Sequence, residues 1–573
     1  MPLFNFRDDE ALGSVTSVDT NTVIVEVNDI ELLRRLQVNR LAVLQSCKPG
    51  QHLIGLITQV TRKKIPLEIS DDDIAPIAEL NLCKIVLIGT LTDRLGIQEN
   101  VFRRTLESVP EIDANCFSLE GENLTGFMRV ISHAANITNA LTIGKYTLDD
   151  NAIAYLNGNK LFQRHAFIGG STGSGKSWTT ATIIEQVSNL RNANAIIFDI
   201  HGEYAPLISP GISHFRIAGP GDIEAKRGLS DGVVHLPYWL LSYEALVSFF
   251  VDRSDQNAPN QSMIMAREVN NSKRKYLEER GETRLLNNFT IDSPVPFRLE
   301  DILESLNFIN TETVQGVRAE KQGEFFGKLS RMISRLENKI SDRRLGFLFQ
   351  GGAETLEFDW LHSLSAALFG SSEEKSGGGV KIIDFSEVPS DILPLIVSLV
   401  ARVAFSVQQW TPATLRHPVA LFCDEAHLYL PDKGNANSSD EISIQIFERI
   451  AKEGRKYGAS LVVISQRPSE VNKTILSQCS NFIAMRLTNA EDQGVIKKLL
   501  PDSLGGFSDI LPTLDTGEAL VVGDASLIPS RIRVDEPENK PNSGTVDFWN
   551  VWQADTAPTR LKTAIDNWRM QSS

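Results

Sequence analysis

Short apolar runs alternate with amphipathic segments along the central and C-terminal parts of this chain. Apolar runs bounded by polar residues or glycine are typical of buried strands, and apolar residues three and four positions apart are typical of helices. The helical pattern covers residues 178–190 and 392–409, and Pro394 falls in the first turn of the second segment, where proline is tolerated. This alternation predicts an α/β domain with a parallel sheet. The predicted strands are residues 166–168, 195–200, 381–385, 418–423, 460–465 and 482–487, followed by two closing strands at 518–522 and 531–534.

The first 140 residues show a different pattern, which predicts a small β-barrel because short strands are separated by glycine and proline. Residues 61–81 are rich in charge and include an acidic cluster at 71–73, so we expect a long loop there. Phe102, Arg103 and Arg104 favour a solvated strand edge over a basic contact site. The β-branched runs of this part are residues 22–27, 53–60 and 84–91.

Residues 231–349 contain no apolar run as strong as those of the predicted sheet. Helical spacing predicts helices here, so this segment is expected to be a helical insertion in the α/β domain. Its basic spots, Lys273 to Lys275 and the pair Arg331 and Arg335, favour solvated helix faces over DNA contact. The predicted helices are residues 246–251, 262–280, 299–306 and 325–340.

A glycine-rich segment between the strand at 166–168 and the helix at 178–190 has the composition and context of a phosphate-binding P-loop. Its glycines allow backbone N–H groups to point at phosphate oxygens, and the helix N-terminus adds partial positive charge. Lys176 is expected to reach the β- and γ-phosphates, and the Ser177 hydroxyl to bind Mg²⁺. A flexible Gly-Ser turn is the weaker alternative. The predicted nucleotide-binding residues are Gly170, Ser171, Thr172, Gly173, Ser174, Gly175, Lys176, Ser177 and Trp178.

Polar side chains follow the other apolar strands, and in a parallel sheet such side chains lie beside the ligand crevice. Asp424 and Glu425 end the strand at 418–423, which is the pattern of a Walker B motif. Asp424 would hold Mg²⁺ through water, and Glu425 would polarise the water that attacks the γ-phosphate. Asp199 and Glu203 are further candidates for the nucleotide site, against the alternative of a loop that merely begins with polar residues.

Three more side chains are candidates for sensing or stabilising the transferred phosphate. Gln466 follows the strand at 460–465, and its amide is suited to sensing the γ-phosphate. Arg455 and Arg486 are candidates for the cation that stabilises the transition state, which a neighbouring subunit can supply. The alternative is that both arginines simply pair with surface acids. The set as a whole predicts a P-loop enzyme that hydrolyses ATP with Mg²⁺.

The bulk properties narrow the class of protein. A chain of 573 residues is too long for one ordinary core, so several domains are expected. The net charge of −15 argues against a surface that coats nucleic acid as a whole, although a locally basic channel is compatible with it. No apolar run approaches the length of a membrane span, and five dispersed cysteines without metal-ligand spacing indicate reduced thiols in the cytoplasm.

Several segments together resemble the HerA family of hexameric DNA-translocating ATPases, which are related to FtsK, and the resemblance covers nearly the whole chain. The matching segments are Leu161-Phe162-Gln163-Arg164-His165, Asp199-Ile200-His201-Gly202-Glu203-Tyr204, Phe422-Cys423-Asp424-Glu425-Ala426-His427, Glu453-Gly454-Arg455-Lys456-Tyr457-Gly458, Ser465-Gln466-Arg467-Pro468 and Ser477-Gln478-Cys479.

This resemblance implies a RecA-like P-loop ATPase core with a helical insertion and an N-terminal HAS-type β-barrel. It implies a homohexameric ring whose channel takes double-stranded DNA. It also implies an Arg455 that reaches the neighbour's γ-phosphate, and a partner, either a nuclease or a sirtuin-type NADase. We expect this partner to dock on the barrel, whose strands carry no cluster of acids, histidines or cysteines that could act on a substrate. The expected domains are the barrel at 1–141, the first part of the core at 142–230, the insertion at 231–349, the second part of the core at 350–534, and a tail at 535–573 that docks on a neighbouring subunit.

Two functions are compatible with these expectations. The first is an ATP-driven translocase or helicase for double-stranded DNA, acting in DNA end processing or anti-phage defence. The second is a ring that binds ATP mainly to assemble and gate a partner effector. A small GTPase or kinase fits poorly, because a strand ending in Asp424 and Glu425 suits the activation of water.

Overall fold

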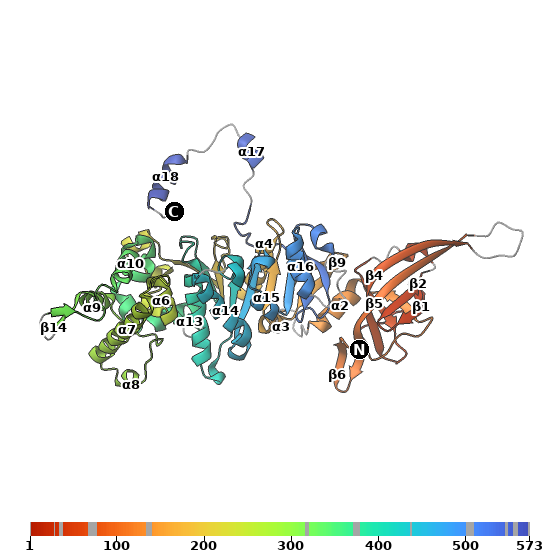
Figure 1. Ribbon diagram of the computed structural model, residues 1–573. Coiled ribbons are helices and arrows are strands. Elements are labelled where there is room, and N and C mark those ends of the chain that lie inside the picture. The colour runs from red at the N-terminus through yellow and green to blue at the C-terminus, as the bar shows by residue number, and fades with distance from the viewer. Residues whose placement is uncertain are drawn as a thin grey trace, which may run out of the picture. The chain divides into compact units, whose positions relative to one another are not determined.

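The computed structural model describes residues 2–27, 29–33, 38–66, 77–132, 140–315, 320–370, 379–435, 438–499, 509–544, 548–553 and 560–570 (Figure 1). The chain forms two compact units. Unit 1 comprises residues 1–186, 466–469 and 477–538, and unit 2 comprises residues 187–465, 470–476 and 539–573.

The N-terminal part of unit 1 is the predicted barrel. Pairing between β2 and β5 closes six strands in the order β2-β1-β7-β3-β4-β5, and β6 (Gln98–Arg103) is added outside β5. Apolar side chains such as Val15, Leu44 and Ile85 fill the interior and are fully buried. The six closing strands are β1 (Gly13–Asp19), β2 (Thr22–Glu26), β3 (Leu41–Gln45), β4 (Gln51–Pro66), β5 (Ile77–Leu95) and β7 (Asn115–Ser118).

The prediction of a long loop at 61–81 is wrong at both ends of that segment. β4 continues to Pro66 and β5 begins at Ile77, so the two strands extend as a paired ribbon, and the acidic cluster at 71–73 lies outside the described residues. Charged residues are tolerated there because a two-stranded ribbon has no buried face of its own. Arg62 and Glu79, for example, form a cross-strand ion pair of 3.1 Å.

The rest of unit 1 is a mixed sheet that carries the P-loop. β10 (Ala166–Gly169) pairs in parallel with β19 (Asn481–Met485), and the remaining strands follow in antiparallel order, β20 (Glu518–Gly523), β21 (Ser530–Val534), β8 (Leu141–Tyr146) and β9 (Asp149–Leu156). Helix α4 (Lys176–Ser188) follows β10 directly after the glycine-rich segment. The predicted strand–loop–helix order is therefore confirmed.

Unit 2 contains a parallel sheet, as the apolar runs predict. Its strand order is β13-β12-β16-β11-β17-β18, and helices α13 (Leu393–Trp410) and α14 (Ser438–Tyr457) pack against each other beside it. Helix α13 is long and apolar enough to cross a membrane, but 72% of it is buried inside the unit, which is typical of a core helix. The strands are β11 (Ala195–Asp199), β12 (Ile212–Ile217), β13 (Val233–Val234), β16 (Val380–Asp384), β17 (Val419–Cys423) and β18 (Ala459–Ser465).

The predicted helical insertion is present in unit 2. Its main helices are α6 (Tyr243–Phe250), α7 (Ala258–Arg280), α9 (Leu299–Thr311) and α10 (Ser330–Ser341), with a short hairpin of β14 (Thr313–Gln315) and β15 (Glu320–Gln322). Helix α12 (Trp360–Phe369) follows the predicted end of the insertion at residue 349. The helix expected at 325–340 begins only at Ser330, because residues 324–328 form a turn.

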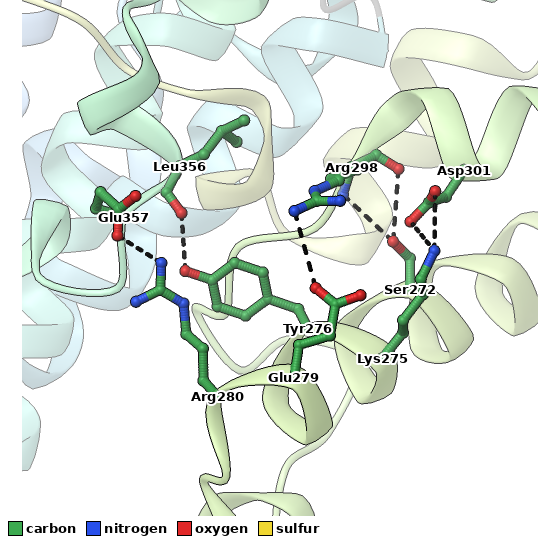
Figure 2. A network of polar contacts seen from close by, with 9 residues as sticks. All are labelled: Ser272, Lys275, Tyr276, Glu279, Arg280, Arg298, Asp301, Leu356 and Glu357. Atoms are coloured by element: carbon green, nitrogen blue, oxygen red, sulfur yellow. Dashed lines mark hydrogen bonds and ion pairs between the residues drawn. The ribbon is translucent and has the colours of Figure 1, made fainter.

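Polar contacts join α7 to α9 and to the segment before α12 (Figure 2). Lys275 forms an ion pair of 3.1 Å with Asp301, and the Tyr276 hydroxyl donates a hydrogen bond of 2.8 Å to the carbonyl of Leu356. Lys273 is buried, and its ammonium donates to the carbonyls of Ile291 and Ser293, both at 2.7 Å. This burial lowers the pKa of Lys273 to about 8. Lys273 is therefore not on a solvated helix face, and Lys275 is engaged within the insertion.

The C-terminal tail contributes two short helices, α17 (Phe548–Gln553) and α18 (Leu561–Met570). Their aromatic side chains are exposed, with Trp552 72% and Trp568 75% accessible. Phe548 and Trp552 form an edge-to-face pair with ring centroids 5.3 Å apart.

Candidate nucleotide site

The glycine-rich segment of unit 1 has a backbone that favours glycine at two positions. Gly173 and Gly175 have φ angles of +73° and +107°, in the region that other residues rarely adopt. A Cβ at Gly175 would lie 2.9 Å from Cε of Met485 and 3.3 Å from Cα of Gly517. The segment therefore curls tightly against its neighbours before α4 begins at Lys176.

Neighbouring segments hold this loop through hydrogen bonds. The Ser171 N–H donates to the carbonyl of Arg486 at 2.8 Å, and the Gly517 N–H donates to the carbonyl of Ser174 at 2.9 Å. The Thr172 hydroxyl donates to the Gln466 side-chain oxygen at 2.5 Å. The structure thus brings Gln466 and Arg486, two of the predicted site residues, into direct contact with the loop.

The loop has the features that a phosphate group requires. The Ser174 hydroxyl is buried and has no hydrogen-bond partner among the described residues. Lys176 is 6% exposed at the start of α4, where the helix N-terminus favours an anion, and Ser177 and Trp178 complete the first helical turn. A Cβ at Gly170 would lie 2.4 Å from the Ser174 hydroxyl oxygen, so the loop has no room for a larger residue there. The residues present therefore fit a nucleotide phosphate.

Acidic residues end three neighbouring strands of unit 2. β11 ends at Asp199 and β16 at Asp384, and these two residues are paired in the parallel register. Asp424 and Glu425 follow β17 and are 2% and 3% exposed. The carboxyl edge of this sheet is therefore strongly acidic, which suits a divalent cation. Sequence reasoning missed Asp384, although an acid at the end of an apolar strand is the same signal that marks Asp199.

The Asp199 side chain accepts hydrogen bonds from the loop that follows its own strand. Its two carboxylate oxygens accept hydrogen bonds from the N–H groups of Glu203 and Tyr204, each at 2.9 Å. Burial raises the pKa of Asp199 to about 6, although these two hydrogen bonds favour the charged form. These contacts support a role in shaping the loop, and direct contact of Asp199 or Glu203 with nucleotide stays a prediction.

Glu425 adopts an uncommon backbone conformation beside a histidine. Its φ and ψ are both 44°, in the left-handed region, which costs free energy for a residue with a side chain and is frequent at functional sites. One carboxylate oxygen lies 3.3 Å from Nδ1 of His427, and the Ser465 hydroxyl lies 3.3 Å from the same nitrogen. The Tyr429 hydroxyl donates to the carbonyl of Asp424 at 3.0 Å. His427 and Tyr429 therefore position Asp424 and Glu425. Neither residue was among the site residues predicted from the sequence.

The two arginine candidates are placed differently from each other. The sequence predicts that Arg455 follows the helix after the Walker B strand. This prediction is wrong, because α14 continues to Tyr457 and Arg455 lies within its last turn. Its side chain is exposed, whereas Arg486 is half-buried directly after β19. Within the described part of the chain, no hydrogen bond or ion pair engages either guanidinium. Pairing with surface acids, the alternative for both, is not observed there.

A glycine-rich loop between a parallel strand and a helix, together with acid-ended parallel strands, defines a P-loop ATPase. Residues 141–404 match the sequence profile described as "Helicase HerA, central domain". The chain is 24% identical over 571 residues to "DNA double-strand break repair helicase HerA" of Sulfurisphaera tokodaii, covering 98% of this chain and 93% of that relative. The chain is therefore similar to HerA helicases over nearly its whole length.

The chain is also similar to other known proteins. The HerA helicase of Pyrococcus furiosus is 26% identical over 429 residues, which cover 69% of each chain. Among solved structures, VirB4 of Thermoanaerobacter pseudethanolicus gives a TM-score of 0.46 at 18% identity, covering 70% of this chain and 97% of that one. The conjugative coupling protein TrwB gives a TM-score of 0.44 at 13% identity, covering 75% and 94%.

Proposed function

We propose that this protein is a ring-forming motor that hydrolyses ATP to move along double-stranded DNA. The observation that carries the proposal is the P-loop with its buried, unpartnered Ser174 hydroxyl, its fixed glycines and its contact with Gln466. Similarity to HerA proteins supports a DNA substrate, because these relatives are named DNA double-strand break repair helicases.

The residues divide the chemistry of hydrolysis between them. Backbone N–H groups of the P-loop and the Lys176 ammonium would bind the phosphates. Ser177 and Asp424 would hold Mg²⁺, which when bound would supply positive charge to the phosphate oxygens. Glu425 accepts a proton from the attacking water, and His427 keeps its carboxylate oriented. Gln466 senses the γ-phosphate, and Arg455 of a neighbouring subunit supplies a fixed charge to the transition state, with Arg486 as the other candidate.

The assembly that we propose is a homohexamer with DNA in its channel. The barrel at 1–141 is a docking platform for an effector, either a nuclease or a sirtuin-type NADase, in DNA end processing or anti-phage defence. The exposed aromatic tail at 535–573 docks on the adjacent subunit, which would bury Trp552 and Trp568. We place the protein in the cytoplasm, where the five free thiols stay reduced.

A steady-state measurement of ATP hydrolysis with and without linear duplex DNA tests the proposal. We expect the isolated protein to hydrolyse ATP and the DNA to accelerate it severalfold, because a translocase couples turnover to DNA in the ring. If DNA accelerates ATP hydrolysis only after an effector is added, this result would favour the second function, a ring that gates its partner. Absence of ATP binding would contradict both functions.

A further inference from the structure

A buried carboxylate lies behind the P-loop and takes no part in the chemistry described above. Glu518 begins β20, and its side chain is 2% exposed. It accepts hydrogen bonds from Arg531 at 2.7 Å, from the N–H of Asp515 at 3.1 Å and from Arg533 at 3.2 Å. Burial opposes ionisation, but the arginines and the Asp515 N–H hold the pKa of Glu518 below its usual range.

These contacts fix the turn that precedes β20. At the start of the turn, the Asp515 N–H donates a hydrogen bond to the Glu518 carboxylate. At its end, the Val534 N–H donates to the carbonyl of Gly517 at 2.9 Å. Gly517 has a φ of +80°, so the turn depends on glycine at this position. The two arginines that grip Glu518 both lie on β21, the strand that also supplies Val534.

The turn also contacts the P-loop from Gly173 to Gly175. Gly517 donates its N–H to the carbonyl of Ser174 at 2.9 Å, and the Thr516 hydroxyl donates to the carbonyl of Gly173 at 3.4 Å. Gly175 packs so closely on Gly517 that a Cβ there would lie 3.3 Å from its backbone. The turn therefore contacts the stretch of loop whose N–H groups must point at the phosphates.

We propose that Glu518 is a positioning residue for the P-loop, which it holds through the Asp515–Gly517 turn. Glu518 does not touch the nucleotide. It stabilises the conformation of the turn that contacts the P-loop, and so stabilises the phosphate-binding conformation of the loop. Arg531 and Arg533 keep Glu518 charged and hold its side chain in position. This proposal rests on the proposed function, since it assigns Glu518 a role at the same nucleotide site.

Titration of the purified full-length protein with a fluorescent, non-hydrolysable ATP analogue tests the proposal. Glu518→Gln keeps the shape of the side chain but removes the charge that both arginines require. We expect analogue affinity to fall roughly tenfold, in the range found when partners that orient a binding residue are removed. The KM for ATP should rise by a similar factor while kcat stays within about threefold, because the catalytic residues are unchanged.

Asp222→Asn is a matched control in unit 2. Asp222 is likewise buried, pairs with Arg216 and Arg227, and accepts a backbone N–H from Gly219 at 3.3 Å. We expect a comparable loss of melting temperature in both variants and a loss of analogue affinity in Glu518→Gln alone. Equal affinity losses in the two variants would show a general stability effect and overturn the proposal.

A milder variant keeps the test decisive if Glu518→Gln does not fold. Arg533→Gln removes one of the two arginines that pair with Glu518. The Arg533 side chain is 60% exposed, so folding should be preserved. Analogue affinity should fall roughly two- to fivefold, as expected for a partly exposed charged hydrogen bond. Unchanged affinity in this variant, with wild-type protein that binds the analogue normally, would overturn the role of Glu518. Wild-type protein that does not bind the analogue would instead contradict the proposed function.

Discussion

Glutamine in place of Glu425 removes the carboxylate that we assign to water activation and preserves its shape. The side chain is 4% exposed, and its oxygen lies 3.3 Å from Nδ1 of His427, so glutamine occupies the same space without a cavity. Positioned acid–base groups contribute about 10²- to 10⁴-fold to rate. We therefore expect kcat to fall by that factor, which is roughly 3–5 kcal/mol of transition-state stabilisation.

Phosphate release at saturating ATP measures this loss, and binding of a non-hydrolysable analogue separates it from a loss of affinity. Analogue affinity should stay near the wild-type value, because Asp424 and the P-loop are intact. Glu453→Gln is the control, since Glu453 is an exposed acid on α14 with an i,i+4 partner in Arg449 at 3.5 Å, and its turnover should not change. A Glu425→Gln protein with kcat within threefold of wild type would refute the assignment of Glu425.

Three further outcomes are expected. DNA affinity should fall steeply between low and physiological salt and should appear only with oligomer formation, because a chain of net charge −15 needs a localised basic wall to release counterions; salt-insensitive binding by a monomer would contradict this. Removal of residues 1–141 should abolish effector binding and keep ATP binding, and a pull-down in which the shortened ring still retains its effector would count against the docking role of the barrel. Mixing Arg455→Ala with Glu425→Gln should restore partial hydrolysis, because some interfaces then join an intact Glu425 to an intact Arg455, whereas mixing Lys176→Ala with Glu425→Gln should restore none. Mixed rings of the first pair that stay inactive would place Arg455 outside the neighbour's site.

Local sequence patterns were sufficient for much of the fold. The apolar runs that became β11, β17 and β18 predicted the parallel sheet, because each of these strands is buried on both faces. The glycine-rich segment predicted its own conformation for a similar reason, since the positive φ angles at Gly173 and Gly175 admit few other residues.

Features that depend on distant partners were not visible in the same way. The ends of β4 and β5 look like a charged loop in sequence, and only their pairing, with Arg62 opposite Asn81, makes them strands. Closure of the barrel by β2 and β5 likewise joins segments some sixty residues apart in the sequence. Periodicity within one segment carries no information on such pairing.

The candidate site shows the same division. Lys176, Ser177, Asp424 and Glu425 stand in motifs whose chemistry is local. Glu518 is an ordinary glutamate in sequence, and its relation to the P-loop arises because the turn before it meets Ser174 more than 300 residues earlier in the chain.

Movement along DNA is the central claim, and displacement of a third strand from a linear duplex tests it most directly. A labelled oligonucleotide bound as a triplex is released only when a motor travels along the duplex and reaches it. We predict ATP-dependent release by the wild-type ring, with a lag that lengthens as the triplex is placed farther from the end, and no release by Glu425→Gln. Vigorous DNA-stimulated hydrolysis without any release of the third strand would contradict the account.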